Sequence, residues 1–269
     1  MNILVLGKAK TGTTIISQTI FQSLENSRFL MEPKDISYFL SDTQDQLIAK
    51  IIFEHWHKTP HLRSALLFNE LPLKFDKIVA IMRDPRDELL SRMFYIAYEL
   101  VRQGGIKLSQ LDSWRELIKI KENHPNQVSV LMLLDTLSKV VGGRLNFDMS
   151  QTFQYFGFLK NKIPHVYTIR YEDFVDKKFE SLENYLGFKL IRDADVGAAL
   201  ARTRRTSSYG NWKYFFLPED IDIFRSAHES KMSEAGYEDW ELVSVDQINP
   251  QYGSLYVDRL LLDATIEGR

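Results

Sequence analysis

The sequence predicts an α/β fold, with a central parallel β-sheet flanked by helices. Three short apolar runs, at residues 2–6, 77–82 and 165–170, have the composition of strands. Each run is followed by a segment with the apolar periodicity of a helix, and the first run leads into a glycine-containing loop. Strands that alternate with helices form parallel sheets, which bind ligands at the carboxyl ends of their strands. We therefore expect a binding site where these three strands end.

The composition excludes several classes of function. Of the 269 residues, 44% are hydrophobic and 26% are charged, and the formal net charge is −2. This balance gives no general attraction to nucleic acid or to an anionic membrane, so that any anion site must be local. The chain has no cysteine, which excludes disulfides, thiolate metal sites and cysteine nucleophiles.

The length of the chain fits one large domain over residues 1–269. No apolar stretch approaches the ~20 residues that span a bilayer, and the first strand begins at residue 2 without a basic leader. We therefore expect a cytoplasmic protein without a transmembrane segment.

The first strand, residues 2–6 (NILVL), is followed by Gly7 and the loop GKAKTGTT. A helix is expected from about Thr13, and its apolar stripe is formed by Ile16, Ile20 and Leu24. A glycine loop that leads into a helix N-terminus offers unpaired backbone N–H groups and the positive end of the helix dipole to an anion.

The loop has the glycine spacing of a nucleotide-binding P-loop but not its lysine. Thr13 and Thr14 follow Gly12 where a P-loop has lysine and then serine or threonine, whereas Lys8 and Lys10 come before Gly12. The alternative is a polar strand-to-helix turn in which Thr13 or Thr14 caps the helix.

The second strand, residues 77–82, leads directly into RDPRDELLS. Asp84 is expected to cap the next helix and Pro85 to occupy its first position. The apolar face of this helix is formed by Leu89, Leu90, Met93, Ile96, Ala97 and Leu100. Arg83, at the strand exit, has the forked donor that suits a phosphate, and Ser91 offers a hydroxyl along the helix flank. In the alternative, Arg83 and Asp84 form an ordinary surface pair and Ser91 is a solvated helix residue.

The third strand, residues 165–170, is followed by the acidic turn YEDF and by a helix that contains Phe179, Leu182 and Leu186. Residues 105–160 are expected to be mostly helical, with a break at two glycines, Gly142 and Gly143. The C-terminal segment, residues 240–269, contains three consecutive leucines that are too apolar to be free in solvent. It should pack on the domain or on a second subunit, and in the second case the protein would be a homo-oligomer.

Two of these segments resemble motifs of the sulfotransferases that use 3′-phosphoadenosine 5′-phosphosulfate (PAPS). KAKTGTT resembles the 5′-phosphosulfate loop of the family, in which Lys10 is the family's lysine. RDPRDELLS is similar to the 3′-phosphate motif, with Arg83 as its arginine and Ser91 as its serine.

Two further segments follow in family order. RRTSSYGNWK resembles the segment that closes over the nucleotide, with Arg205, Gly210, Trp212 and Lys213 in register. RYEDF is similar to the strand exit whose tyrosine, here Tyr171, lies near the adenine. The resemblance covers most of the chain and implies the P-loop-like sulfotransferase fold.

The resemblance also implies a reaction. An acceptor hydroxyl would attack the sulfur of PAPS in line and release 3′,5′-ADP, without a metal or a redox group. Lys10 would stabilise the charge on the leaving oxygen, while the N–H groups from Thr11 to Thr14 and the threonine hydroxyls hold the other oxygens. Lys8 would add positive potential, or else be a solvated side chain.

The expected general base is Glu32, in the segment FLMEPKDISYF. This segment resembles the EPKEPHFF type of carbohydrate sulfotransferases, whose acidic residue removes the acceptor proton, and Glu32 stands 22 residues after Lys10. Asp35 is the nearby substitute, and Lys34 would steer anionic groups of the substrate. In the alternative, Glu32 is a surface glutamate before a proline.

A competing base lies in FEHWHKTPHL. Its HKTP resembles the EKTP segment of the family, so that Lys58 would contact the sulfonate or the acceptor, and His57 or a neighbouring histidine would take the proton. A zinc site at these histidines is disfavoured, because Pro60 interrupts any helix that would align them and no second ligand cluster is evident. In the alternative, these histidines are structural.

The third segment departs from the family pattern at two positions. Ser207 replaces a glycine and Asn211 an acidic residue, so the roles of Arg204 and Arg205 could be exchanged. Trp212 contacts the nucleotide or anchors the core. The segment after it lacks the dimer motif of cytosolic sulfotransferases, and we infer no such dimer.

Two other functions remain open. A P-loop small-molecule kinase would need the lysine after Gly12 that this chain lacks. A catalytically silent nucleotide-binding protein would bind 3′,5′-ADP without transferring a group. The interpretation that we favour is a soluble sulfotransferase of bacterial type that acts on a glycan, a glycolipid or a small alcohol.

Overall fold

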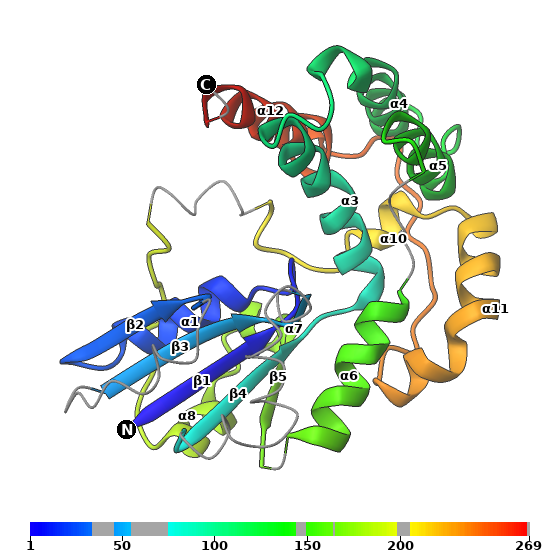
Figure 1. Cartoon of the computed structure of the whole chain (residues 1–269). Coiled ribbons are helices and arrows are strands. Elements are labelled where there is room, and N and C mark those ends of the chain that lie inside the picture. Colours follow the sequence, from blue (N-terminus) through cyan, green and yellow to red (C-terminus); the bar gives the residue numbers. More distant parts are fainter. Residues whose placement is uncertain (34–45, 55–74, 144–148, 164, 198–204, 268–269) are drawn as a thin grey trace. The chain divides into compact units, whose positions relative to one another are not determined.

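The structure is a computed structural model of the chain, and it describes residues 1–33, 46–54, 75–143, 149–163, 165–197 and 205–267. It divides into two compact units (Figure 1). The first unit comprises Met1–Arg83 and Ser150–Gly197, and the second comprises Asp84–Met149 and Ala198–Arg269. That residues 1–269 form a single domain stays a prediction.

The first unit contains a five-stranded parallel sheet in the order β2-β3-β1-β4-β5 (Figure 1). The strands are β1 (Asn2–Gly7), β2 (Ser27–Met31), β3 (Gln46–Ile52), β4 (Lys77–Met82) and β5 (Tyr167–Arg170). The three expected strands are therefore confirmed, although the third begins at Tyr167 rather than at His165. The strands β2 and β3 were not expected from the sequence.

Helices cover both faces of this sheet. On one face, α6 (Ser150–Lys162) packs Tyr155 and Leu159 against β1, β3 and β4, and Ile163, directly after the helix, joins the same cluster. On the other face lie α1 (Thr13–Gln22), α7 (Tyr171–Val175) and α8 (Glu180–Leu186). This arrangement confirms the α/β fold with a parallel sheet between helices.

The second unit is helical. It comprises α3 (Pro85–Arg102), η4 (Leu108–Leu111), α4 (Asp112–Asn123), α5 (Val130–Val140), α10 (Trp212–Phe215), α11 (Pro218–Glu234), η5 (Pro250–Tyr252) and α12 (Ser254–Glu267). As expected, Asp84 caps α3, where its side chain accepts the Arg86 N–H, and Pro85 is the first helical residue. The expected apolar face is buried except at Ile96 and Leu100, which are partly exposed.

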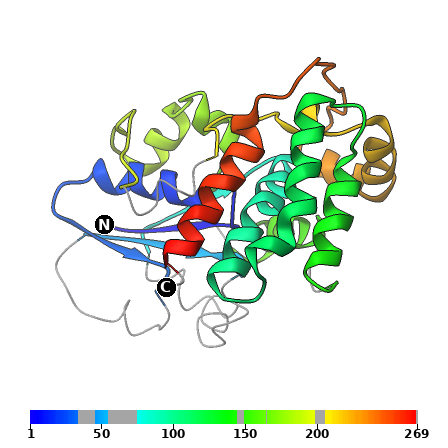
Figure 2. The same cartoon turned by 90° about the horizontal axis from the view of Figure 1, so that it is seen from above.

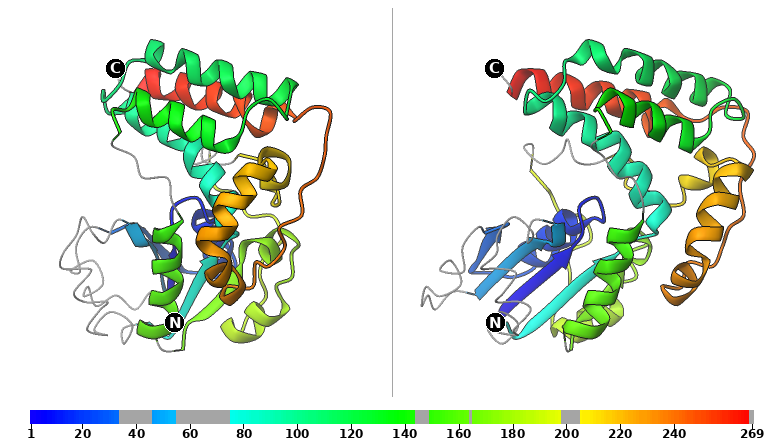
Figure 3. Two further views of the ribbon diagram at one scale, coloured as in Figure 1. Left: turned by 90° about the vertical axis from the view of Figure 1, so that its right-hand side faces the viewer. Right: turned by 45° about the vertical axis from the view of Figure 1, so that its right-hand side comes forward.

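The C-terminal helix α12 lies alongside α3 and α4 (Figures 2 and 3). Its residues Leu260 and Leu261 are buried, whereas Leu262 is exposed. The buried carboxylate of Glu122 on α4 accepts the N–H and the hydroxyl of Ser254, the first residue of α12. Among the residues that the structure describes, no helix combines the length and the apolar character needed to cross a membrane.

Candidate active site

The loop after β1 folds around the carbonyl oxygen of Lys8. This oxygen accepts the Thr11 N–H at 3.3 Å, the Thr11 hydroxyl at 2.7 Å and the Thr13 hydroxyl at 3.2 Å. Thr11 and Thr13 are buried. Their hydroxyl protons are therefore used inside the loop, which they hold in shape for the helix that begins at Thr13.

Both loop glycines are needed because other side chains approach their Cα atoms. A Cβ atom on Gly7 would lie 1.8 Å from Thr13 Oγ1. A Cβ atom on Gly12 would lie 2.5 Å from the ring of Tyr171, and Gly12 also has a φ of +91°, which L-residues rarely adopt. The glycine spacing that resembles a P-loop is thus explained by packing at each of its two ends.

Lys8 is fully buried, so the alternative that it is a solvated side chain is wrong. Its Nζ lies 3.2 Å from Glu54 Oε1, and Glu54 also accepts the Ala9 N–H at 3.0 Å. Glu54, just beyond β3, was not singled out in the sequence. Its carboxylate balances the Lys8 charge and fixes the start of the loop.

Lys10 has a different environment from Lys8. It is half-buried, and its φ of +69° places it in the left-handed region. Its carbonyl oxygen accepts a hydrogen bond of 2.9 Å from Arg83 Nη1. The strand exit after β4 therefore fixes the backbone of the loop at the residue expected to act on the leaving oxygen.

Arg83, directly after β4, and Tyr171, directly after β5, lie beside the loop that follows β1 in the first unit. Arg83 is 5% exposed, and its guanidinium lies 4.4 Å from the centroid of the Tyr171 ring, which in turn contacts Gly12. The structure thus brings together the exits of β1, β4 and β5. Because Arg83 and Asp84 are both buried, the alternative of an ordinary surface pair is wrong. Burial raises the pKa of Asp84, and the hydrogen bonds and charge of Arg86 oppose that rise.

Glu32 directly follows β2, where its φ is +50°. Its Oε1 lies 2.7 Å from Lys50 Nζ, and its side chain is 30% exposed. Lys50, in the middle of β3, is buried, and its Nζ also donates to Thr14 Oγ1 at 2.9 Å. One buried ammonium therefore joins the candidate base to the loop. Sequence reasoning missed Lys50, although a lysine inside the apolar run QLIAKII was a signal.

Five of the expected site residues lie outside the described part of the chain. They are Lys34, Asp35, His57, Lys58 and Arg204. Within the described residues, no group of three or more histidine, aspartate or glutamate side chains could hold a metal ion.

The second unit holds the remaining expected residues. Ser91 on α3 is 2% exposed, so the alternative of a solvated serine is wrong. Arg205 donates to the Tyr252 carbonyl at 3.0 Å, and its guanidinium lies 5.8 Å from the Phe94 ring. Gly210 has a φ of +74°, and Trp212 is buried, with Arg86 3.7 Å from its ring.

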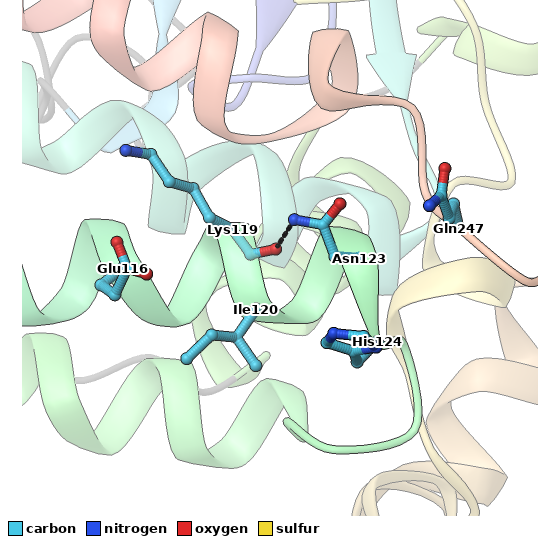
Figure 4. Close-up of a pocket in the computed structure, with 6 residues that line it drawn as sticks. All are labelled: Glu116, Lys119, Ile120, Asn123, His124 and Gln247. Atoms are coloured by element: carbon cyan, nitrogen blue, oxygen red, sulfur yellow. Dashed lines mark hydrogen bonds between the residues drawn. The ribbon is translucent and has the colours of Figure 1, made fainter.

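The second unit also contains an open hollow beside α4, with a volume of about 400 Å³ (Figure 4). It is lined by Glu116, Lys119, Ile120, Asn123, His124 and Gln247. Asn123 Nδ2 donates to the Lys119 carbonyl across one turn of the helix. None of these residues belongs to the motifs described above, and the hollow is therefore not the candidate active site.

Comparison with known proteins identifies the family. The sulfotransferase domain family matches residues 1–189 of this chain, whereas a comparison with curated proteins finds no match. Among solved structures, the mouse sulfotransferase SULT7A1 complexed with PAP has 16% identity and a TM-score of 0.47, and the alignment covers 88% of this chain and 85% of that chain. Retinol dehydratase in a complex with retinol and PAP has 11% identity and a TM-score of 0.43, and the alignment covers 87% of this chain and 81% of that chain. The family match spans more than half of the chain, which therefore belongs to the sulfotransferase domain family and is a PAPS-dependent sulfotransferase.

Proposed function

We propose that this sulfotransferase moves the sulfuryl group of PAPS to a hydroxyl acceptor, with Lys10 and Glu32 as its catalytic residues. The observation that carries this proposal is the meeting of the Lys10 loop, Arg83 and Tyr171 at the ends of three parallel strands. Ligands of open α/β sheets bind at such strand ends. The donor supplies the sulfuryl group and leaves as 3′,5′-ADP, also abbreviated PAP.

The loop and the start of α1 would hold the 5′-phosphosulfate. The N–H groups of the first helical turn, from Gly12 to Thr14, have no carbonyl partner inside the helix and attract an anion. Lys50 only donates, so the Thr14 hydroxyl accepts its bond and keeps its own proton for a phosphate oxygen. Lys10 would neutralise the charge that develops on the oxygen bridging phosphorus and sulfur as the sulfur–oxygen bond breaks.

Glu32 would take the proton of the acceptor hydroxyl as the new oxygen–sulfur bond forms. Its ion pair with Lys50 holds the carboxylate two hydrogen bonds away from Thr14 of the loop. A base in a fixed position is what such a reaction requires. Asp35 and His57 are the substitutes if Glu32 is not the base, and Lys34 and Lys58 would contact the acceptor or the sulfonate.

The 3′-phosphate would be bound by Arg83 and Ser91 together with Arg205 and Gly210, or with Arg204 in place of Arg205. Lys8 would support the nucleotide site by fixing the start of the loop, because Glu54 is paired with its ammonium and balances its positive charge. Tyr171 would lie near the adenine. Trp212 would support nucleotide binding indirectly, because its buried ring anchors the segment that contains Arg205 and Gly210.

The acceptor class follows only from the Glu32 segment, which resembles that of carbohydrate sulfotransferases. We therefore propose a sugar hydroxyl of a glycan or glycolipid, or a small alcohol, and a bacterial-type enzyme. A silent nucleotide-binding protein would share the nucleotide site but would transfer no sulfuryl group.

The nucleotide site can be tested by thermal unfolding with 3′,5′-ADP, 5′-AMP or magnesium ATP at one concentration. We expect 3′,5′-ADP to raise the Tm much more than 5′-AMP, because Arg83 and Ser91 bind the 3′-phosphate. Equal shifts for the two adenylates would contradict the proposed site. A larger shift with magnesium ATP would favour the kinase.

A further inference from the structure

The first turn of α3 binds the segment that precedes α10. Asp87, the third residue of α3, is fully buried, and its Oδ1 accepts the Trp212 N–H at 3.0 Å. Its Oδ2 accepts the N–H of Gly210. One carboxylate of α3 therefore caps the start of α10 and fixes the backbone of residues 210–212.

Arg86 strengthens this attachment. Its guanidinium contacts two indole rings, 3.7 Å from the centroid of Trp212 and 4.6 Å from that of Trp240. Asp84 fixes the guanidinium by accepting bonds of 2.9 Å from Nε and 2.7 Å from Nη2, and Arg86 Nη1 donates to the Asp239 carbonyl. Arg86 is 1% exposed, so that its cation–π contacts are shielded from solvent.

The segment 205–212 contacts α3 at two positions, one before and one after Ser91. Asp87, Ser91 and Phe94 stand at positions i, i+4 and i+7 of α3 and thus share one helix face. The segment contacts Asp87 through Gly210 and Trp212, and it approaches Phe94 through Arg205, whose guanidinium lies 5.8 Å from the ring. Ser91 lies between these two contacts along the helix.

We propose that Asp87 is a positioning residue for recognition of the 3′-phosphate, because it fixes the segment that presents Arg205 and Gly210 on the helix face of Ser91. The inference rests on the proposed binding of the 3′-phosphate by these residues. Asp87 itself does not touch the nucleotide, since a carboxylate would repel a phosphate. Its effect is exerted through the backbone of the segment.

The test compares the affinities of the full chain for 3′,5′-ADP and 5′-AMP, which differ only in the 3′-phosphate, by titration calorimetry. In Asp87→Asn the amide nitrogen cannot accept the second N–H, so the segment is held at one point instead of two. We expect the ratio of the two affinities to fall by about tenfold or more, with the affinity for 5′-AMP nearly unchanged. An unchanged ratio would overturn the proposal.

Asp220→Asn is the matched control. Asp220 is also fully buried in the second unit, and it accepts the N–H groups of Val130, Leu131 and Leu217. The Asp220→Asn variant should lower the Tm as Asp87→Asn does, but it should leave the ratio of the two affinities at its wild-type value. An equal fall of the ratio in both variants would show that lost stability alone is responsible, and would also overturn the proposal.

A second measurement needs no variant. Amide hydrogen exchange of residues 209–213 in the wild-type chain should slow when 3′,5′-ADP binds and should change little with 5′-AMP. Equal protection by the two ligands would contradict the role of the segment, even if Asp87→Asn failed to fold. A wild-type protein that binds both ligands equally well would instead contradict the proposed function.

Discussion

The substitution Gly7→Ala tests the packing of the phosphosulfate loop. Gly7 is the last residue of β1, and it pairs with Ile52 on β3 and Ile81 on β4. The new Cβ atom would lie 1.8 Å from Thr13 Oγ1 and 2.8 Å from two carbon atoms of the same side chain. No rotation of Thr13 alone relieves all of these contacts, so the start of α1 must move away from the strand.

The cost of this change has two parts. Overpacking of a rigid site costs about 1–3 kcal/mol. The movement also disturbs the hydrogen bond of 3.2 Å that the Thr13 hydroxyl donates to the Lys8 carbonyl, at roughly 0.5–1.5 kcal/mol. Together they predict a loss of roughly 1.5–4.5 kcal/mol and a fall in Tm of roughly 3–18 °C.

The assay is thermal unfolding with and without 3′,5′-ADP, and Gly157→Ala is its matched control. Gly157 lies inside α6, and a Cβ atom there meets nothing within 4 Å. The control should therefore be neutral or stabilising by up to about 1 kcal/mol, because alanine favours helix. A Tm of Gly7→Ala within about 2 °C of the wild type would refute the packing argument.

Three other substitutions test single contacts. Lys50→Met removes the ammonium that holds Glu32, and we expect kcat/KM for the acceptor to fall by about tenfold or more, whereas full activity would exclude this role. Glu54→Gln removes the negative charge that pairs with the buried Lys8, so the free energy of unfolding in urea should fall by about 1–3 kcal/mol. An unchanged midpoint would contradict this. Burial lowers the pKa of Lys121 to about 8 from its ordinary 10.5. Above pH 8 the folded state therefore loses a proton that the unfolded state keeps, so the free energy of unfolding should rise between pH 8 and 9.5. Lys121→Met should remove that part of the rise, and equal pH dependence of variant and wild type would disprove the assignment.

Local patterns predicted the elements that carry their own signals. The strands β1, β4 and β5 are short apolar runs, and the cap at Asp84 with Pro85 identifies the start of α3 without any tertiary information. The three strands also end where the candidate site lies, because a parallel sheet places its strand ends along one edge. The expectation that the three exits meet in space was therefore accessible from the sequence.

The residues that sequence reasoning missed depend on distant partners. Lys50 interrupts the apolar run of β3, and its burial makes sense only with Glu32 and Thr14 beside it. Glu54 was missed because its partner Lys8 is distant in sequence, and for Lys8 the sequence left open whether it adds positive potential or is solvated. Asp87 resembled an ordinary acidic residue of a first helical turn, and only the folded chain shows the two N–H groups that it binds.

The central claim, that Lys10 drives sulfuryl transfer, is tested most directly with PAPS labelled in its sulfuryl group. The wild-type chain and the Lys10→Ala variant would be incubated with a panel of sugars, glycolipids and small alcohols, and labelled product and 3′,5′-ADP would be quantified. We predict that the wild type forms both in equal amounts with at least one acceptor, and that Lys10→Ala loses turnover by a factor on the order of a hundred or more while it still binds 3′,5′-ADP. Equal turnover by the two proteins, or no transfer by the wild type to any acceptor, would contradict the claim.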